Sequence, residues 1–170
     1  FGIYECPFPY KRIMRPQALQ KMAETGKFKF LKDTCCDAGL IGEKLRAVQG
    51  SGLKIFNANA ATLLETLRDG CAGYSGVMAN FHPEIYAWLC ENFDTEPEKA
   101  EKVQNFAGFF SVAECQMYPV NAKYYLNLEG LDIATFCRSR SDADFTRNRK
   151  LEIDQMRALT SDFKDCIGLS

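Results

Sequence analysis

Short apolar runs alternate with longer amphipathic segments through the first half of the chain. Runs typical of strands occupy positions 2–6, 27–32, 53–57 and 76–80, and segments of helical length and periodicity occupy 16–24, 38–49, 61–69 and 83–92. Glycines follow several of these helical segments, where helices commonly end. Regular alternation at this spacing favours βαβ units with a parallel sheet, and so predicts an α/β fold.

The pattern changes after about residue 95. Positions 98–115, 121–136 and 145–166 carry the apolar spacing of amphipathic helices, and no strand-like run interrupts them. We therefore expect residues 1–95 to form four βα units and residues 96–170 to form a helical extension of three helices. No low-complexity tract or linker separates the two parts.

Lys32 closes one of the strand-like runs, in the segment Phe-Lys-Phe-Leu-Lys-Asp-Thr. With a period of two, Phe28, Phe30 and Lys32 share one side of the strand, so this lysine lies beside two aromatic residues expected to be buried. Desolvation favours the neutral form of an amine, and a neutral amine can add to a ketone to form a Schiff base. The alternative is a lysine that extends from the strand end into water.

A second feature lies at a fixed distance from this lysine. Tyr4 ends the first strand-like run and Pro7 follows it, 28 positions before Lys32. The pair resembles the dihydrodipicolinate synthase and N-acetylneuraminate lyase superfamily of class I aldolases. In that superfamily a tyrosine of a Tyr-x-x-Pro motif ends one barrel strand, and the Schiff-base lysine of a Lys-Asp or Lys-Glu motif ends the next.

The resemblance continues along nearly the whole chain. Ile-Phe-Asn-Ala-Asn at 55–59 is similar to the next strand and its substrate-lining loop, and the glycine-rich segment 73–80 is similar to the approach to the last strand. Residues 123–131 resemble the C-terminal helical segment of the family. The order of the motifs implies the C-terminal half of a (β/α)8 TIM barrel, strands five to eight. A missing N-terminal half-barrel or a second copy of the chain would complete it, and we expect a fragment of a longer enzyme and a homo-oligomer.

The resemblance also implies a chemistry. Lys32 would attack the ketone of pyruvate or another 2-oxo acid, and the resulting imine would allow a carbon–carbon bond to an aldehyde to form or break. Tyr4 would shuttle protons, and main-chain groups near Ala58 and Met78 would line the pocket. Thr34, with Asp33, would brace the strand end of the lysine, and Thr34 is also a candidate substrate-binding residue. No cofactor is implied.

Polar residues at other strand ends are weaker candidates. Asn57 and Asn59 could bind hydroxyl groups of a substrate, although asparagines in turns look the same in sequence. The family's biosynthetic synthases carry an arginine where this chain has Pro9, and Phe30 replaces a small residue. These departures favour a divergent aldolase or lyase over the lysine-pathway enzyme.

Composition excludes several other classes. The 21 basic and 22 acidic residues give a net charge of −1 with no basic stripe, so we expect no nucleic-acid partner. No apolar run could span a bilayer, so no membrane association is expected. The eight cysteines form no Cys-x-x-Cys pair and only one histidine is present, which argues against a metal site and for a reducing cytoplasm.

Two further hypotheses remain open. The chain could be a non-catalytic half-barrel that serves as an assembly or binding module. Alternatively, the adjacent Cys35 and Cys36 could have a redox role.

Overall fold

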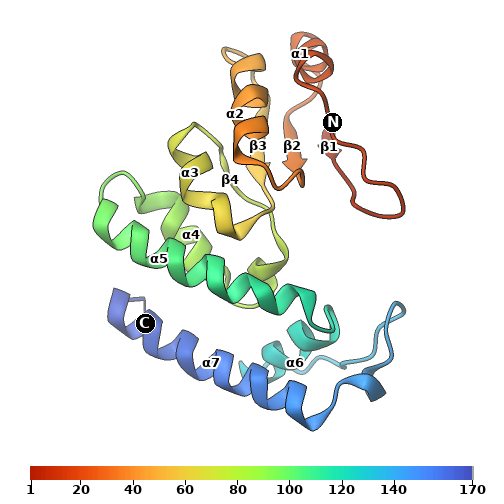
Figure 1. The fold of residues 1–170 in the computed structure, drawn as a ribbon, viewed down its shortest axis with the longest axis vertical. Helices are drawn as coiled ribbons and strands as arrows, with labels where there is room; N and C mark the ends of the chain where they lie inside the picture. Colours follow the sequence, from red (N-terminus) through yellow and green to blue (C-terminus); the bar gives the residue numbers. More distant parts are fainter. Residues whose placement is uncertain (170) are drawn as a thin grey trace.

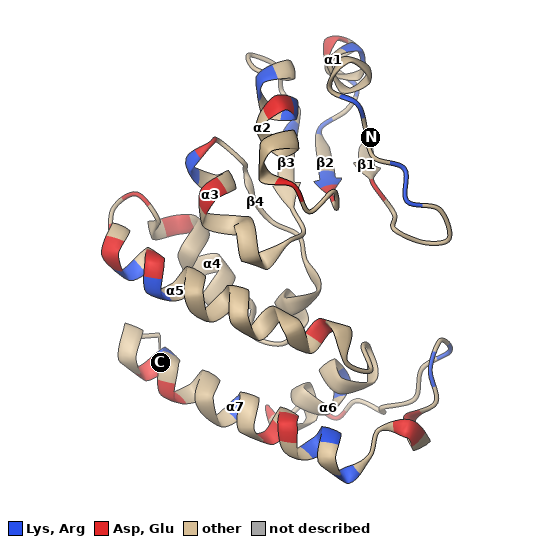
Figure 2. Ribbon diagram, in the orientation of Figure 1, with Lys and Arg blue, Asp and Glu red and all other residues tan. Residues whose placement is uncertain are grey.

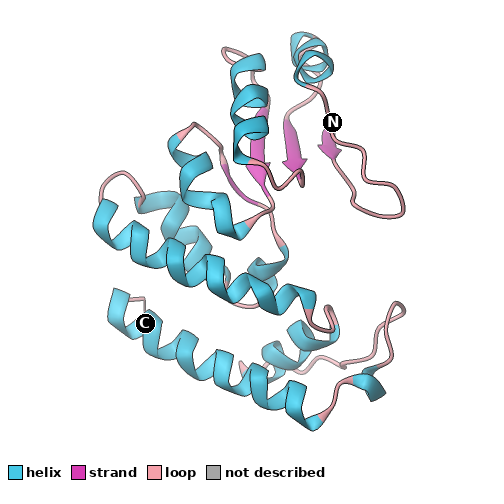
Figure 3. Cartoon of the chain, viewed as in Figure 1, coloured by secondary structure: helices cyan, strands magenta, loops and turns pink. Residues whose placement is uncertain are grey.

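Four parallel strands form the sheet of the molecule, in the order β1-β2-β3-β4 (Figures 1 and 3). The computed structural model describes residues 1–169. The strands are β1 (Gly2–Tyr4), β2 (Phe30–Asp33), β3 (Lys54–Asn57) and β4 (Gly73–Tyr74). Because each pair is parallel and sequential, all carboxyl ends meet at one edge of the sheet.

Helices connect the strands and then continue alone to the end of the chain. The connecting helices are α1 (Pro16–Glu24), α2 (Ala38–Ala47), the 3₁₀ turn η1 (Ala60–Thr62) with α3 (Leu63–Arg68), and, after β4, the 3₁₀ turn η2 (Val77–Asn80) with α4 (Pro83–Asn92). The C-terminal extension comprises α5 (Pro97–Phe110), η3 (Ser111–Cys115), α6 (Val120–Leu128), η4 (Asp142–Asp144) and α7 (Arg147–Ile167). This arrangement is that of a half TIM barrel followed by a C-terminal extension with three α-helices, as the sequence predicted.

The first and last connecting helices have the predicted bounds, and their starts have a local cause. Pro16 and Pro83 each stand at the first position of a helix, where the missing N–H of proline costs nothing. Asp37 caps α2 by accepting a hydrogen bond from the backbone N–H of Leu40 at 3.0 Å. The loop chemistry therefore specifies these helices locally.

Two predicted elements are wrong in part. The fourth strand does not cover 76–80: it is Gly73–Tyr74, and Val77–Asn80 forms the 3₁₀ turn η2. A short apolar run predicts burial, but its periodicity does not separate a strand from a buried helical turn. The predicted helix 121–136 ends at Leu128, because Gly130 follows with a φ of 91° that stops the helix.

Two hydrophobic clusters stabilise the fold. The first lies between the sheet and the helices α1 and α2, and includes Leu19, Leu31, Ile41 and Ile55. The second joins α3 and α4 to the C-terminal helices α5, α6 and α7. The boundary near residue 95 stays a prediction, and residues on both sides of it share this second cluster.

The other face of the sheet, which we call the inner face, carries large side chains that are open to solvent. Phe30 is 46% exposed and Tyr4 is 52% exposed. The ring of Phe30 lies over Gly2, where an added Cβ would come within 2.2 Å of it. The expectation that Lys32 lies beside buried aromatics is therefore wrong for Phe30 in this chain, because within residues 1–169 nothing covers that ring completely.

Charged residues are distributed over the helices without a surface of one sign. Figure 2 shows basic and acidic residues interspersed along α2, α5 and α7. Within residues 1–169 no helix combines the length and the apolar character needed to cross a bilayer.

Candidate active site

Tyr4 and Lys32 lie side by side at the carboxyl ends of β1 and β2. The two residues are direct partners in the parallel register. The Nζ atom of Lys32 lies 4.9 Å from the centre of the Tyr4 ring. The parallel pairing of two short strands thus brings together the two residues that the sequence singled out, on the inner face.

The surroundings of Tyr4 favour its neutral phenol. Partial burial raises the pKa of this hydroxyl, and the nearby Cys6 and Tyr118 raise it further. A neutral phenol can both donate and accept a hydrogen bond, as a proton shuttle must. Tyr118 belongs to the loop before α6, so the C-terminal extension reaches the neighbourhood of this rim.

An ionic cluster lies beneath these strand ends, on the outer face of the sheet. The Lys44 ammonium donates to Oε1 of Glu5 at 2.6 Å and to Oδ2 of Asp33 at 2.5 Å, and all three side chains are fully buried. Burial alone would lower the pKa of Lys44, but the hydrogen bonds to Asp33 and Glu5 outweigh it and raise the pKa above its usual range. We call these three residues the buried ionic triad.

Thr34 braces the strand end through contacts with Glu5, whereas its role in substrate binding stays a prediction. Its backbone N–H donates to Oε2 of Glu5 at 3.0 Å, and its hydroxyl donates to the backbone carbonyl of Glu5 at 2.5 Å. Asp33 also accepts a hydrogen bond from the backbone N–H of Cys35 at 2.8 Å. The turn that follows Lys32 is therefore fixed by side chains that point away from the inner face.

The two candidate asparagines form the turn after β3. Asn57 is buried, and its amide group donates to the hydroxyls of Thr62 and Thr66, both at 3.0 Å. Its Oδ1 accepts from the N–H of Asn59 at 2.7 Å, and Asn59 in turn caps Ala61. The structure does not bring the Asn57 side chain to the rim, because its partners lie on the helix side.

Ala58 and Met78 are placed differently from each other. Ala58 is half-buried at the carboxyl end of β3, where its N–H donates to the carbonyl of Asp33 at 2.9 Å. Met78 lies in η2 beyond the end of β4, and its side chain is fully buried in the core. The predicted strand 76–80, which contains Met78, is wrong, and a role of the main-chain groups near Met78 in lining the site stays a prediction.

The sequence did not single out Lys44. It lies on the same face of α2 as Ile41 and Val48, which are three and four positions away and buried. A lysine on an apolar helix face indicates a buried acidic partner. Glu5 and Asp33, which directly follow the two candidate catalytic residues, are these partners. That combination could have been found from sequence.

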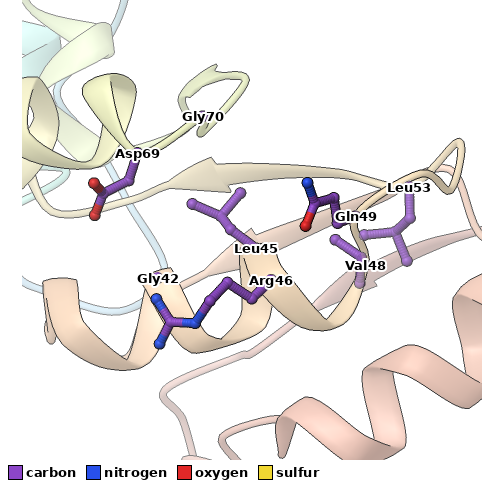
Figure 4. Close-up of a pocket in the computed structure, with 8 residues that line it drawn as sticks. All are labelled: Gly42, Leu45, Arg46, Val48, Gln49, Leu53, Asp69 and Gly70. Carbon is purple, nitrogen blue, oxygen red and sulfur yellow. The ribbon is translucent and has the colours of Figure 1, made fainter.

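One cleft of the structure lies away from Tyr4 and Lys32. It has a volume of about 390 Å³ and is formed by the last turns of α2 together with Leu53, Asp69 and Gly70 (Figure 4). Leu53 and Gly70 precede β3 and β4, so this cleft is at the amino ends of the strands. It is therefore at the opposite end of the sheet from Tyr4 and Lys32.

Comparisons with solved structures show the same fold in part of larger proteins. A dihydrodipicolinate synthase from Bacillus anthracis aligns with a TM-score of 0.82 and 14% identity, over 92% of this chain and 53% of that one. A putative dihydrodipicolinate synthase family protein from Coccidioides immitis gives 0.78 and 20%, over 99% and 56%. The Acinetobacter baumannii synthase, solved with pyruvate, gives 0.77 and 17%, over 91% and 53%.

The chain thus spans about half the length of these structures. A sequence search of curated proteins found no significant match. A comparison with family models matches residues 2–155 to the dihydrodipicolinate synthetase family. This match covers most of the chain, and it agrees with the parallel sheet and its lysine at a carboxyl end. The chain belongs to the dihydrodipicolinate synthetase family.

Proposed function

We propose that this chain supplies the nucleophile and the proton shuttle of a Schiff-base aldolase or lyase. The substrates would be pyruvate, or another 2-oxo acid, and an aldehyde. The observation that carries the proposal is the pairing of the Lys32 amine with the Tyr4 phenol at adjacent carboxyl strand ends. Active sites of (β/α)8 enzymes lie at this edge of the barrel, and the Acinetobacter baumannii relative was solved with pyruvate.

The residues divide the reaction between them. The neutral amine of Lys32 adds to the ketone carbon. The oxygen of the resulting adduct receives one proton from the lysine nitrogen and one from Tyr4, so that it leaves as water and Tyr4 becomes a phenolate. The protonated imine that remains acts as an electron acceptor. In cleavage, it accepts the electron pair of the carbon–carbon bond next to it. In condensation, it allows the carbon next to the imine to lose a proton and attack an aldehyde. In cleavage, the Tyr4 phenolate accepts the proton of the substrate hydroxyl as that oxygen becomes the carbonyl of the departing aldehyde. In condensation, it takes the proton that the carbon loses and donates it to the newly formed alkoxide oxygen.

The proposal includes a partner for the sheet. Strands β1 and β4 each have one neighbour, and Phe30 and Tyr4 are open on the inner face. Parallel sheets are normally covered on both faces, and free edges invite pairing. We propose that further βα units, from the same polypeptide or from a second copy of this chain, close the barrel. We call the result the assembled barrel.

Reductive trapping tests this function. The assembled barrel is incubated with pyruvate and borohydride, and peptides are analysed by mass spectrometry. The reduced imine is expected as a three-carbon acid attached to Nζ of Lys32. Lys32→Met should abolish the adduct, whereas Lys54→Met, which removes an exposed lysine from the adjacent strand, should leave it unchanged.

The absence of an adduct on Lys32 would contradict the proposal, if it held for pyruvate and for a panel of longer 2-oxo acids. It would favour the reading of the chain as an assembly or binding module. An adduct that formed equally on Lys54 or on other exposed lysines would also contradict it, because it would indicate unselective chemistry.

A further inference from the structure

The buried ionic triad joins the two residues that directly follow the proposed catalytic pair. Glu5 comes after Tyr4, and Asp33 comes after Lys32. Successive residues of a strand point to opposite faces, so each catalytic side chain is on the inner face while its neighbour reaches the outer face. There Lys44, from α2, contacts both carboxylates within 2.6 Å.

The triad also fixes the backbone on both sides of the pair. Glu5 accepts hydrogen bonds from the N–H of Met14 at 2.8 Å and of Thr34 at 3.0 Å, in addition to Lys44. Asp33 accepts from the N–H of Cys35 at 2.8 Å. A single lysine thus connects α2, the end of β1, the loop before α1 and the turn after β2.

Stability alone gives little reason for such a cluster. Buried ion pairs can often be replaced by apolar residues of similar volume with no loss of stability, because desolvation offsets their attraction. The triad adds a geometric restraint, because the Lys44 ammonium must lie within hydrogen-bonding distance of two carboxylates. The ammonium of Lys44 can bond both carboxylates only when the ends of β1 and β2 are in one relative position.

We propose that Lys44 is a positioning residue that holds the Tyr4 phenol beside the Lys32 amine. Lys44 does not contact the inner face, and it acts through Glu5 and Asp33 on the strand ends. The inference rests on the proposed function, because it concerns the rate of the same Schiff-base reaction. Misplacement of a proton shuttle by about 1 Å can lower a rate about 100-fold.

A double-mutant cycle on the assembled barrel tests this role. The variants are Lys44→Met, Tyr4→Phe and the two combined, with Lys102→Met as the control for loss of an exposed lysine. The rate constant of borohydride trapping is measured at several pyruvate concentrations, and circular dichroism reports the folded fraction. Lys44→Met should lower the saturated rate by about 10- to 100-fold and change the half-saturating pyruvate concentration by less than about threefold.

The combined variant gives the decisive comparison. If Lys44 acts by positioning the Tyr4 phenol, it has nothing to position in the Tyr4→Phe variant. Adding Lys44→Met to that variant should therefore slow trapping by less than about twofold. Effects that multiply would overturn the inference, and so would a Lys44→Met protein that traps pyruvate at the wild-type rate. Asp33→Asn, which keeps the Lys44–Glu5 pair, replaces Lys44→Met in the cycle if the latter does not fold.

The controls separate this inference from the proposed function. Wild-type protein and Lys102→Met must both form the adduct on Lys32. Failure of both contradicts the proposed function, whereas normal trapping by both together with normal trapping by Lys44→Met contradicts only the positioning role.

Discussion

The ends of the strands are held in two different ways. Beneath β1 and β2 the connection is ionic, with Lys44 between Glu5 and Asp33. Beneath β3 it is neutral, with the Asn57 amide between Thr62 and Thr66 at 3.0 Å each. Both groups connect strand ends to a helix on the outer face, Glu5 and Asp33 to α2 and Asn57 to η1 and α3. The first connection uses charged groups, and the second uses an amide and hydroxyls.

The difference follows the proposed chemistry. The ionic connection lies under the two residues that would react, and the neutral one lies under a turn that would at most line the pocket. A charged hydrogen bond is roughly twice as strong as a neutral one and more demanding in geometry. A strand end that carries a reacting group gains most from such a restraint.

The largest expected effect comes from breaking the ionic connection. Lys44→Met should lower the free energy of unfolding by about 3–5 kcal/mol, because it leaves two carboxylates buried without their cation. Chemical denaturation followed by circular dichroism measures this. An effect below that of Asn57→Ala would contradict the contrast drawn between the two connections.

A smaller effect on the free energy of unfolding is expected when acid protonates His82, which lies near β4. His82 is fully buried, stacks on Tyr86, and has no hydrogen-bond partner for either ring nitrogen among residues 1–169. Burial lowers the pKa of His82 from 6.5 to about 4. The nearby Glu84 raises this pKa, and Lys164 lowers it further. The unfolded chain therefore binds a proton between these pH values that the folded chain does not.

Stability should accordingly fall as the pH is lowered from about 6.5 to about 4, by about 3 kcal/mol from this residue. The measurement is denaturant unfolding over this pH range for the wild type and for His82→Phe. The difference between the two profiles isolates the histidine from carboxylates that titrate nearby. Parallel profiles would show that His82 has the same pKa in the folded and the unfolded chain.

Breaking the neutral connection should cost less than breaking the ionic one. Asn57→Ala leaves the hydroxyls of Thr62 and Thr66 and the N–H of Asn59 without their partner, and we expect a loss of about 1–3 kcal/mol. The rate of pyruvate trapping by the folded protein should change far less than in Lys44→Met. An equal loss of rate in both variants would show that the charge beneath β1 and β2 has no special role.

The smallest effect is expected from an exposed ion pair remote from both connections. Arg157 donates to Glu129 at 2.6 Å between α7 and the end of α6, and both side chains remain partly exposed. Glu129→Gln should change the free energy of unfolding by less than about 1 kcal/mol. A loss comparable to that of Lys44→Met would indicate that burial is not what distinguishes the triad.

Local patterns predicted much of the fold. The periodic segments 16–24 and 83–92 predicted the bounds of α1 and α4, and the alternation of runs predicted the parallel sheet. The pairing of Tyr4 with Lys32 was implied by the resemblance of two motifs to the family, and the structure places the two residues in register. The short strand β4 was missed because the apolar run 77–79, in which Met78 is buried and Val77 and Ala79 are half-buried, forms a 3₁₀ turn with the same composition as a strand.

The buried partners were harder to predict, because they depend on contacts between distant segments. Glu5 and Lys44 are 39 positions apart, and only the parallel pairing of β1 with β2 brings both to one side of the sheet. Asn57 looked like a rim residue, yet its amide is bound by threonines that follow it on the helix side. Residue type indicated a polar contact in each case but not its direction.

The alternation of faces along β1 and β2 has a consequence for how the protein could evolve. Substitutions at Phe30 or Phe56 would reshape the space next to a substrate without touching Glu5, Asp33 or Lys44 on the reverse of the same strands. Substrate preference could therefore drift, or be redesigned, while the scaffold under the reacting amine stays constant. The inner face of the proposed site could thus diverge while the buried ionic triad is retained.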